Sequence, residues 1–178
     1  MNVLKGKLSG CVIIEPKTYG DERGFFLETF QDVRYAELAG ITLPFVQDNH
    51  SRSKKGVLRG LHFQKSKPQG KLVRVARGKV FDVALDIREG SHTFGQWDTV
   101  VLSEKNKKQL WVPPGFAHGF VVLSDFADFE YKCTDYYDPF DEGVIFWNDP
   151  GLAIPWPIKK PIISKKDAAA PNLIDLNL

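Results

Sequence analysis

Residues 79–87 read KVFDVALDI, in which every second residue from position 81 onward is apolar. Since side chains alternate between the two faces of a β-strand, this pattern predicts a strand with one apolar face, formed by Phe81, Val83, Leu85 and Ile87. Other segments between the 15 glycines and 11 prolines are also short and rich in Val, Ile, Phe and Trp, which is typical of all-β proteins. We predict strands at 24–30, 45–51, 57–63, 71–76, 79–87, 96–102, 109–112, 119–123 and 128–134. About nine or ten strands fit a β-sandwich or jelly roll that closes around a cavity.

Composition limits the classes of function. A chain of 178 residues with 43% hydrophobic residues can bury one core, so we expect one domain over residues 1–178. The net charge of +2, from 24 basic and 22 acidic residues, argues against a nucleic-acid partner. No apolar stretch is long enough to span a membrane and no signal peptide is evident, so we expect a cytoplasmic protein. Cys11 and Cys133 show no disulfide or zinc-site spacing and are expected to be small buried residues.

Helices are expected at few places. Residues 32–39 form the best candidate, with Asp32 as the N-terminal cap and Gly40 at the C-terminus. A second short turn is expected after Ser164, where an alanine run follows. The proline-rich stretch 150–161 indicates an extended arm lying over the sandwich, and we assign residues 150–178 to this arm.

A jelly roll that contains histidines suggests a cupin metal site, in which an HxH pair, a glutamate and a later histidine hold a divalent ion. Gly56 and His62 match the first motif, but Gln64 occupies the next ligand position and residues 68–69 are Pro-Gln rather than glutamate. The second cupin motif is present as PPGFAH, which ends in His118. Two histidines without a suitably spaced carboxylate make a poor transition-metal site. We therefore expect a cavity without metal, in which both histidines are candidate acid–base or anion-binding groups.

The stretch VLRGLHFQ, residues 57–64, carries two candidate site residues. Strand alternation places His62 with Leu58 and Gly60 on one face and Arg59 with Leu61 on the other, apart from any bulge near the glycine. His62 and Arg59 therefore lie close together but need not point the same way. A lone strand histidine is also compatible with a purely structural role.

Further candidates have a structural alternative as well. His118 follows a Pro-Gly turn, either at the mouth of a barrel or as a turn cap. Gln47 and Asn49 form either an exposed edge or a row facing a ligand. Tyr131 is either an acid–base group or a core aromatic, and Arg23 in DERGFF is either a phosphate contact or a solvated turn residue.

Several motifs taken together resemble one family. They are DERGFFLETF, VLRGLHFQ, KLVRVARGKVFDVALDIR, SHTFGQWDTVVLS, QLWVPPGFAHGF, YKCTDYY, FWNDP and ISKKDAAAP. In this order they resemble the dTDP-4-dehydrorhamnose 3,5-epimerase family over nearly the whole chain. RGLH, PxGFAHGF, TDYY and SxKD are specific in combination. The resemblance implies a cupin-like jelly roll that works as a homodimer on a dTDP-sugar without a cofactor.

The resemblance also implies roles for individual residues. His62 is the implied general base, Tyr131 the general acid, and Asp167 the carboxylate that pairs with the histidine. The implied substrate contacts are Arg23, Glu28, Gln47, Asn49, Arg59, Lys71, His118, Glu142 and Lys166. Phe63 departs from the family pattern, which more usually has tyrosine, and the tail beyond Pro171 matches nothing in it.

The expected reaction is conversion of dTDP-4-dehydro-6-deoxy-D-glucose to dTDP-4-dehydro-L-rhamnose in deoxysugar biosynthesis. A 4-ketone acidifies the hydrogens at C3 and C5, so inversion needs a base on one face and an acid on the other. Lys71 is the candidate partner of the enolate oxygen, with His118 as the alternative. Arg23 and Arg59 are the candidates that bind the diphosphate, because the planar guanidinium group can donate to two phosphate oxygens at once. The competing functions are a mono-epimerase or ketoisomerase, a metal-dependent cupin enzyme, and a non-catalytic sugar-nucleotide-binding module.

Overall fold

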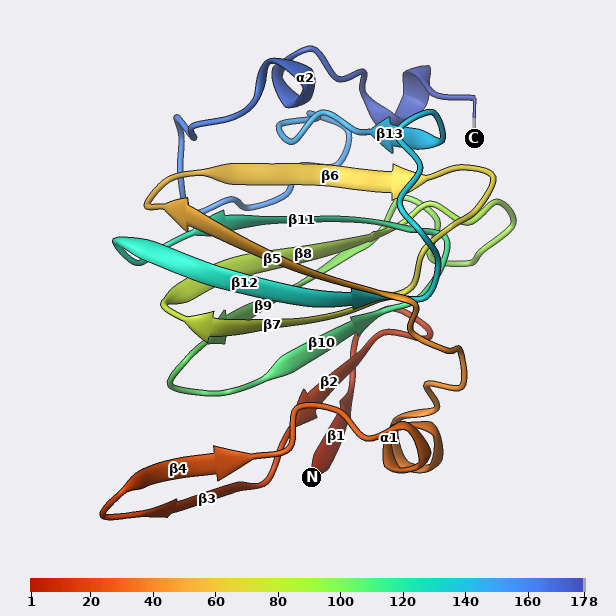
Figure 1. Ribbon diagram of the computed structural model, residues 1–178. Helices are drawn as coiled ribbons and strands as arrows, with labels where there is room; N and C mark the ends of the chain where they lie inside the picture. Colours follow the sequence, from red (N-terminus) through yellow and green to blue (C-terminus); the bar gives the residue numbers. More distant parts are fainter. Residues whose placement is uncertain (178) are drawn as a thin grey trace.

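The computed structural model describes residues 1–177, and two antiparallel sheets packed face to face form its body (Figure 1). The six-stranded sheet has the order β1 (Asn2–Lys5), β2 (Val12–Glu15), β10 (Gln109–Val112), β7 (Lys71–Arg77), β12 (Phe126–Cys133) and β5 (Gln47–Lys54). The five-stranded sheet has the order β13 (Glu142–Val144), β6 (Leu58–Gln64), β11 (Phe116–Val122), β8 (Lys79–Asp86) and β9 (Trp97–Ser103). β3 (Thr18–Asp21) and β4 (Gly24–Leu27) pair as a separate hairpin.

The chain passes repeatedly from one sheet to the other between β5 and β13. This connectivity is that of a jelly roll, so the predicted all-β fold is confirmed. The sequence did not predict β1, β2, β3 or β13 as strands. Each of them has four residues or fewer, and a segment of that length is too short to show a clear alternation.

Strand β8 lies between β11 and β9 in the five-stranded sheet, and both of its faces are buried. The predicted apolar face exists, since Val83, Leu85 and Ile87 pack in one cluster with Leu152 and Ile154 of the C-terminal arm. The opposite face of β8 looks into the space between the sheets, where Val80 and Ala84 join the main core. The residue between them on that face is Asp82, which has no exposed surface.

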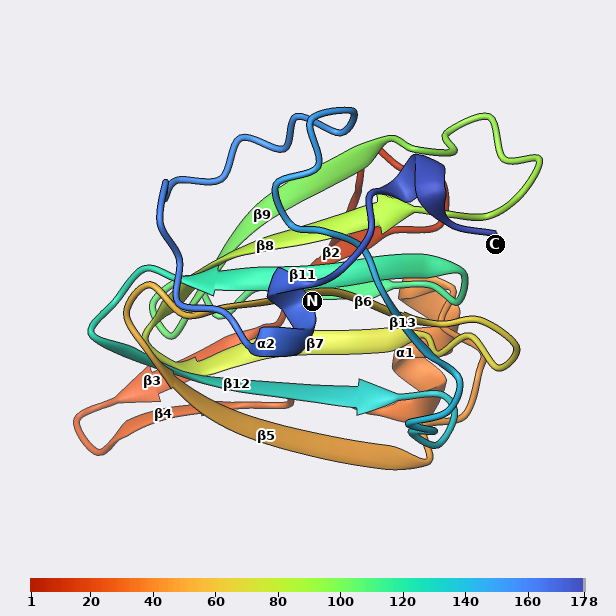
Figure 2. The ribbon, with the colours of Figure 1, turned by 90° about the horizontal axis from the view of Figure 1, so that it is seen from above.

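The C-terminal arm crosses the outer face of the five-stranded sheet (Figures 1 and 2). It carries the short helix α2 (Lys165–Ala168), which lies beside β6, and the 3-10 helix η1 (Leu173–Asp175). The arm predicted over residues 150–178 is described as far as residue 177, and Leu178 lies outside the described residues. Ser164 caps α2 by accepting a hydrogen bond from the backbone N–H of Asp167 at 3.0 Å. The turn predicted after this serine is therefore present.

Helix α1 (Asp32–Ala39) packs on the outer face of the six-stranded sheet, where Tyr35 lies in a cluster with Ile14 and Trp111. The predicted bounds are confirmed, and Gly40 ends the helix at φ 69°, a backbone angle that favours glycine. The predicted cap is wrong. The side chain of Gln31, one residue earlier, accepts the hydrogen bond from the backbone N–H of Arg34. Among residues 1–177, no helix has the length and hydropathy to cross a bilayer.

Candidate functional site

A cavity of about 320 Å³ lies between the two sheets, a size that suits a small-molecule ligand. Strands β5, β7 and β12 form one wall, and β6 and β11 form the other. The residues that line it are Gln47, Asn49, Ser51, Arg59, His62, Phe63, Gln64, Gln69, Lys71, His118, Phe120, Phe129, Tyr131, Tyr137 and Glu142. Most of the site residues predicted from the sequence are in this set.

His62 on β6 pairs with Asp167, which comes from the C-terminal arm on the outer side of the sheet. The distance between Nε2 of the histidine and Oδ1 of the aspartate is 2.8 Å. The carboxylate is only 3% exposed, whereas the imidazole keeps an exposed edge in the cavity. Burial alone would raise the pKa of Asp167, but the hydrogen bond and charge of His62 and the hydrogen bonds from Ser164 and Gly60 together outweigh burial, and the pKa lies below its ordinary value. The pair is therefore an imidazole held by an ionised carboxylate.

A bulge in β6 turns Arg59 and His62 toward the same cavity. His118 of β11 lies opposite His62, and Phe120 lies opposite Arg59, so Gly60 and Leu61 together face one residue of β11. Gly60 has φ +129°, which an L side chain rarely adopts, and a Cβ there would lie 2.5 Å from the Cα of Gly119. The simple alternation predicted for this strand is interrupted at that point. Both polar side chains consequently line the cavity.

His118 forms a second imidazole–carboxylate pair on the core side of the same sheet. Its Nε2 lies 2.9 Å from Oδ1 of Asp82 on β8. The ring lies near Phe129 at a small interplanar angle of 27°, and the side chain is nearly buried. The turn-cap alternative for His118 is excluded by this position inside β11.

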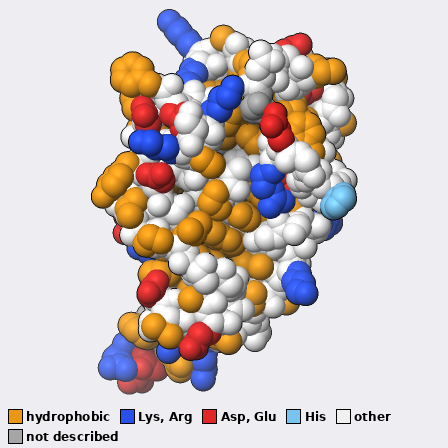
Figure 3. All heavy atoms as spheres, turned by 90° about the vertical axis from the view of Figure 1, so that its right-hand side faces the viewer, with side chains coloured by type: hydrophobic (Ala, Val, Ile, Leu, Met, Phe, Trp, Pro, Cys, Tyr) orange, Lys and Arg blue, Asp and Glu red, His pale blue; other side chains and the backbone are white. Residues whose placement is uncertain are grey.

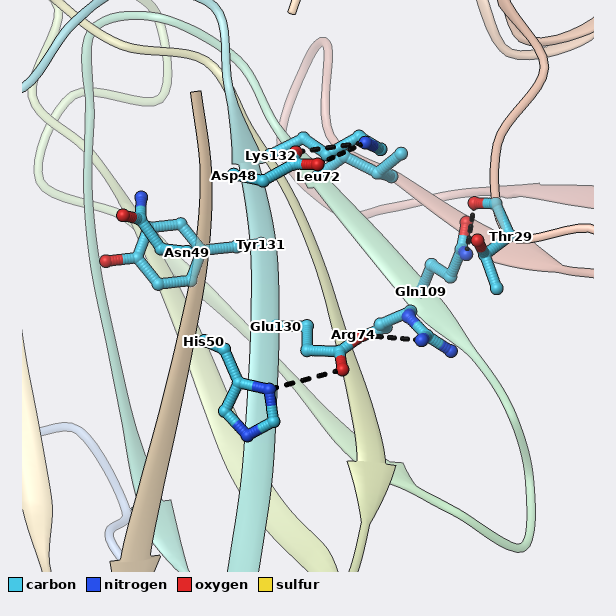
Figure 4. Close-up of a pocket in the computed structure, with 10 residues that line it drawn as sticks. All are labelled: Thr29, Asp48, Asn49, His50, Leu72, Arg74, Gln109, Glu130, Tyr131 and Lys132. Atoms are coloured by element: carbon cyan, nitrogen blue, oxygen red, sulfur yellow. Dashed lines mark hydrogen bonds and ion pairs between the residues drawn. The ribbon is translucent and has the colours of Figure 1, made fainter. Parts of the chain in front are cut away.

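Tyr131 faces the cavity from the six-stranded sheet, opposite the wall that carries His62. Figure 4 shows that Tyr131 and its cross-strand neighbour Asn49 project away from the charged side chains of the outer face, such as Glu130 and His50. Burial raises the pKa of Tyr131 above its ordinary value. The phenol therefore keeps its proton at neutral pH.

Charged groups complete the lining. Lys71 on β7 is half-buried, and its burial lowers the pKa of the ammonium group. Arg59 donates from Nε to Oγ of Ser53 at 3.0 Å. Glu142 on β13 is ion-paired with Lys166 of the arm. Burial alone would raise the pKa of Glu142, but the hydrogen bonds from Lys166 and Tyr137 and the nearby positive charges together outweigh burial, so this carboxylate stays ionised.

Comparison with known proteins assigns a family to this arrangement. The family model described as dTDP-4-dehydrorhamnose 3,5-epimerase matches residues 5–175. The chain belongs to this epimerase family. A relative of that name from Salmonella typhimurium is 58% identical over 175 residues, which cover 97% of this chain and 96% of the relative.

Solved structures of epimerases also share the fold. The crystal structure of dTDP-6-deoxy-D-glucose-3,5-epimerase from Legionella pneumophila, in complex with dTDP-4-keto-L-rhamnose, has a TM-score of 0.96 and 60% identity. The match covers 99% of this chain and 94% of that one. A 3'-monoepimerase from Streptomyces bikiniensis, in complex with dTDP-quinovose, has a TM-score of 0.88 and 32% identity, with 98% of this chain and 88% of that chain covered. The epimerase fold therefore includes enzymes that differ in the number of centres inverted.

Three predicted substrate contacts, Arg23, Glu28 and Lys166, are not among the residues that line this cavity. Lys166 is ion-paired with Glu142, which does line it. Arg23 sits at the tip of the β3–β4 hairpin and pairs with Asp21 in the same turn. Glu28, just after β4, pairs with Arg34 of α1. Within one chain of this epimerase, Arg23 and Glu28 do not line the cavity that contains His62.

Sequence reasoning also missed several residues of the epimerase cavity. Tyr137, in the TDYY motif, donates a hydrogen bond to Glu142 at 2.8 Å. Gln64 accepts from the backbone N–H of Asp138 at 2.8 Å and so holds the loop that carries this tyrosine. The other missed lining residues are Ser51, Phe63, Gln69, Phe120 and Phe129. Alternation along β5 indicates a row formed by Gln47, Asn49 and Ser51. Gln64 and Gln69, in contrast, have no local sequence pattern that marks them as lining residues.

In residues 1–177, no three His, Cys, Asp or Glu side chains converge as ligands of a metal ion would. The cupin motif positions agree with this, since Gln64 lines the cavity at the place where a second histidine ligand would stand.

Proposed function

We propose that this chain is a cytoplasmic isomerase that converts dTDP-4-dehydro-6-deoxy-D-glucose to dTDP-4-dehydro-L-rhamnose by inverting C3 and C5. Residues 1–178 would act as one epimerase domain in deoxysugar biosynthesis. The observation that carries this proposal is the pairing of His62 with Asp167 on one wall of a cavity that Tyr131 faces from the other wall. Inversion of a carbon next to a ketone requires at least one base and one acid, placed on opposite faces of the sugar.

His62 is the proposed general base. A carboxylate only accepts hydrogen bonds, so ionised Asp167 holds the proton on Nε2 and leaves Nδ1 free to remove a proton from the sugar. The imidazolium that forms is then stabilised by the adjacent negative charge. Asp167 is a positioning residue in this scheme, and its location on the arm means that α2 must stay docked on β6 for the base to work.

Tyr131 is the proposed general acid. Its raised pKa keeps the phenol protonated, and its place on the opposite sheet lets it donate to the face of the enolate that His62 does not reach. Lys71, which lines the cavity, provides a cation for the enolate oxygen. The proposed contacts to the rest of the substrate are Gln47, Asn49, Arg59, His118, Glu142 and Lys166.

Incubation of the 4-keto substrate in deuterated water tests this function directly. We expect deuterium at both C3 and C5 of the product, because each inversion replaces a carbon-bound hydrogen with one from solvent. Mass spectrometry and proton NMR of the product measure the label. Label at one carbon would support the mono-epimerase alternative, and its absence from both would refute proton abstraction by this cavity.

We also propose that two copies of the chain form a dimer in which each hairpin completes the cavity of the other. The β3–β4 hairpin projects from the body and forms the lower end of the molecule in Figure 3, with basic and acidic side chains at its tip. Tyr19, Phe25 and Phe26 are more than half exposed on it. A lone hairpin is marginally stable in water, and β5 is an edge strand beside the cavity. A hairpin docked at this edge of a second copy would bring Arg23 and Glu28 to the substrate.

Mixed dimers test the hairpin proposal. Arg23→Ala is expected to raise KM about tenfold or more through loss of a charge-assisted contact to the diphosphate. Co-refolding this variant with a His62→Asn variant is expected to restore activity, because one cavity then combines an intact His62 with an intact Arg23 from the other chain. Steady-state kinetics on the mixture, with the mass measured by light scattering, gives the result. No gain over the separate variants would contradict the shared cavity.

A further inference from the structure

Helix α2 carries Asp167 to its place beside His62 but has no apolar face of its own. In the stretch 164–169, the side chain of Asp167 is buried and the other five residues are exposed. A helix of a single turn is not stable by itself. The position of α2 above β6 in Figure 1 therefore depends on the polar contacts of Asp167 and on the two segments that flank the helix.

The segment before α2 is fixed to the start of β6. Ile162 forms a parallel β-bridge with Val57. Its backbone N–H donates to the carbonyl oxygen of Gly56 at 2.8 Å, and its own carbonyl oxygen accepts from the N–H of Leu58 at 3.0 Å. This bridge fixes the chain where it enters α2, but it does not hold the end of the helix beyond Asp167.

The segment after α2 is fixed to the turn that follows β13. The carbonyl oxygen of Pro171 accepts from the backbone N–H of Phe146 at 2.8 Å. The backbone N–H of Leu173 donates to Oδ2 of Asp149 at 2.7 Å. The other oxygen of this carboxylate, Oδ1, accepts from the backbone N–H of Gly151 at 2.8 Å. Asp149 thus joins the beginning of the arm to η1 and closes a loop that contains α2.

Asp149 is only 6% exposed, and each of its oxygens accepts from a backbone N–H group. Hydrogen bonds to an ionised carboxylate are stronger than those between neutral groups. Asp86 is a comparable buried carboxylate, because it too accepts from the N–H of the residue two positions later, Arg88, at 3.0 Å. The loop that Asp86 holds lies between β8 and β9 and carries no residue proposed for the reaction. The loop that Asp149 closes carries Asp167.

We propose that Asp149 is a positioning residue whose carboxylate closes the arm and thereby holds Asp167 at His62. This inference rests on the proposed function. Without the hydrogen bond from Leu173, the end of α2 opposite the Ile162 bridge is released, and the carboxylate of Asp167 no longer stays at Nε2 of the imidazole. The imidazole is then presented to the sugar in the required orientation in fewer molecules. A misplacement of about 1 Å can lower the rate of a reaction about 10²-fold.

Asp149→Ala tests this role, because alanine accepts no side-chain hydrogen bond and both contacts are lost. We expect kcat on the 4-keto substrate to fall about tenfold or more. The same change is made in an Asp167→Ala background, where the expected further fall is less than about twofold, since the contact through which Asp149 acts is already absent. Loss of stability alone would lower the measured kcat by the same factor in both backgrounds, and that result would contradict the proposal.

Asp86→Ala is the matched control, since it removes a carboxylate of similar burial that holds a different loop. It is expected to lower the melting temperature and to leave kcat unchanged. Steady-state kinetics and calorimetry on all the variants give the comparison. A fall in kcat for Asp86→Ala as large as that for Asp149→Ala would show that any lost buried carboxylate has this effect, and would overturn the assignment.

A pair of changes at Leu173 tests the hydrogen bond even if Asp149→Ala fails to fold. Leu173→Pro removes the N–H donor, and the backbone accepts proline there because Leu173 begins η1 and Asn172 has φ −70° and ψ 160°. Leu173→Ala is its control, because it also shortens the side chain but keeps the N–H. We expect kcat to be about tenfold lower for the proline variant than for the alanine variant.

Deuterium incorporation by the wild type is measured first, so that the two hypotheses can be separated. A wild type without label would refute the proposed function and this inference with it. A labelled wild type with equal kcat in Leu173→Pro and Leu173→Ala would overturn the role of Asp149 alone.

Discussion

Replacement of His62 by asparagine is expected to lower kcat by at least about 10³-fold, or about 4 kcal/mol of transition-state free energy, with little change in substrate binding. Asparagine keeps a polar group near Asp167, so the buried carboxylate retains a hydrogen-bond partner and the arm stays docked. It cannot take a proton at neutral pH. The measurements are steady-state kinetics on the 4-keto substrate and calorimetric titration with the same dTDP-sugar.

His92→Asn is the matched control for this variant, because His92 is an exposed residue of the loop between β8 and β9 and does not line the cavity. It is expected to retain full turnover. Deuterium exchange at C3 and C5 should also disappear in His62→Asn, since no group remains to remove either hydrogen. Turnover within a factor of ten of the wild type would remove His62 from the mechanism.

Alternation along the chain predicted the strands of the sandwich well, but it could not distinguish the two buried faces of β8. In KVFDVALDI, the large residues mark one face and leave the aspartates on the other, and the pattern does not show that this second face is buried as well. In the structure the arm covers the large residues, and Asp82 points into the core between the sheets. A second layer over an outer face is a tertiary feature, so local periodicity contains no signal for it.

In the site, too, local sequence patterns predict some features and not others. Asp167 is 105 residues away from its partner His62, and no spacing rule links a strand to an arm that returns across its outer side. Alternation alone favoured Tyr131 as a core aromatic, and the bulge at Gly60 reversed the expected separation of Arg59 and His62. The family resemblance supplied the residues that local patterns could not. It named Arg23 without indicating that, in a single chain, this residue lies on the hairpin away from the cavity.

Removal of one hydroxyl group in Tyr131→Phe is expected to separate the two halves of the reaction. The general acid is lost, so inversion should slow by about 10²- to 10⁴-fold. Proton abstraction by His62 on the other face does not need the phenol and should continue. The enolate then recovers a proton, or deuterium in heavy water, from the same face, and the substrate is regenerated with its configuration retained. Proton NMR of the recovered 4-keto sugar is expected to show deuterium without the epimerised product.

Tyr35→Phe is the matched control for the loss of a buried tyrosine hydroxyl. Tyr35 lies on the far side of the six-stranded sheet, where its hydroxyl contacts Gln109 and the backbone oxygen of Thr29. Loss of these hydrogen bonds should cost about 1 kcal/mol of stability and leave turnover intact. If Tyr131→Phe inverted the sugar as fast as the wild type, the proton on the second face would have to come from another donor. If it lost deuterium exchange together with inversion, Tyr131 would be needed for proton abstraction itself, and the assignment of base and acid to opposite sheets would be wrong.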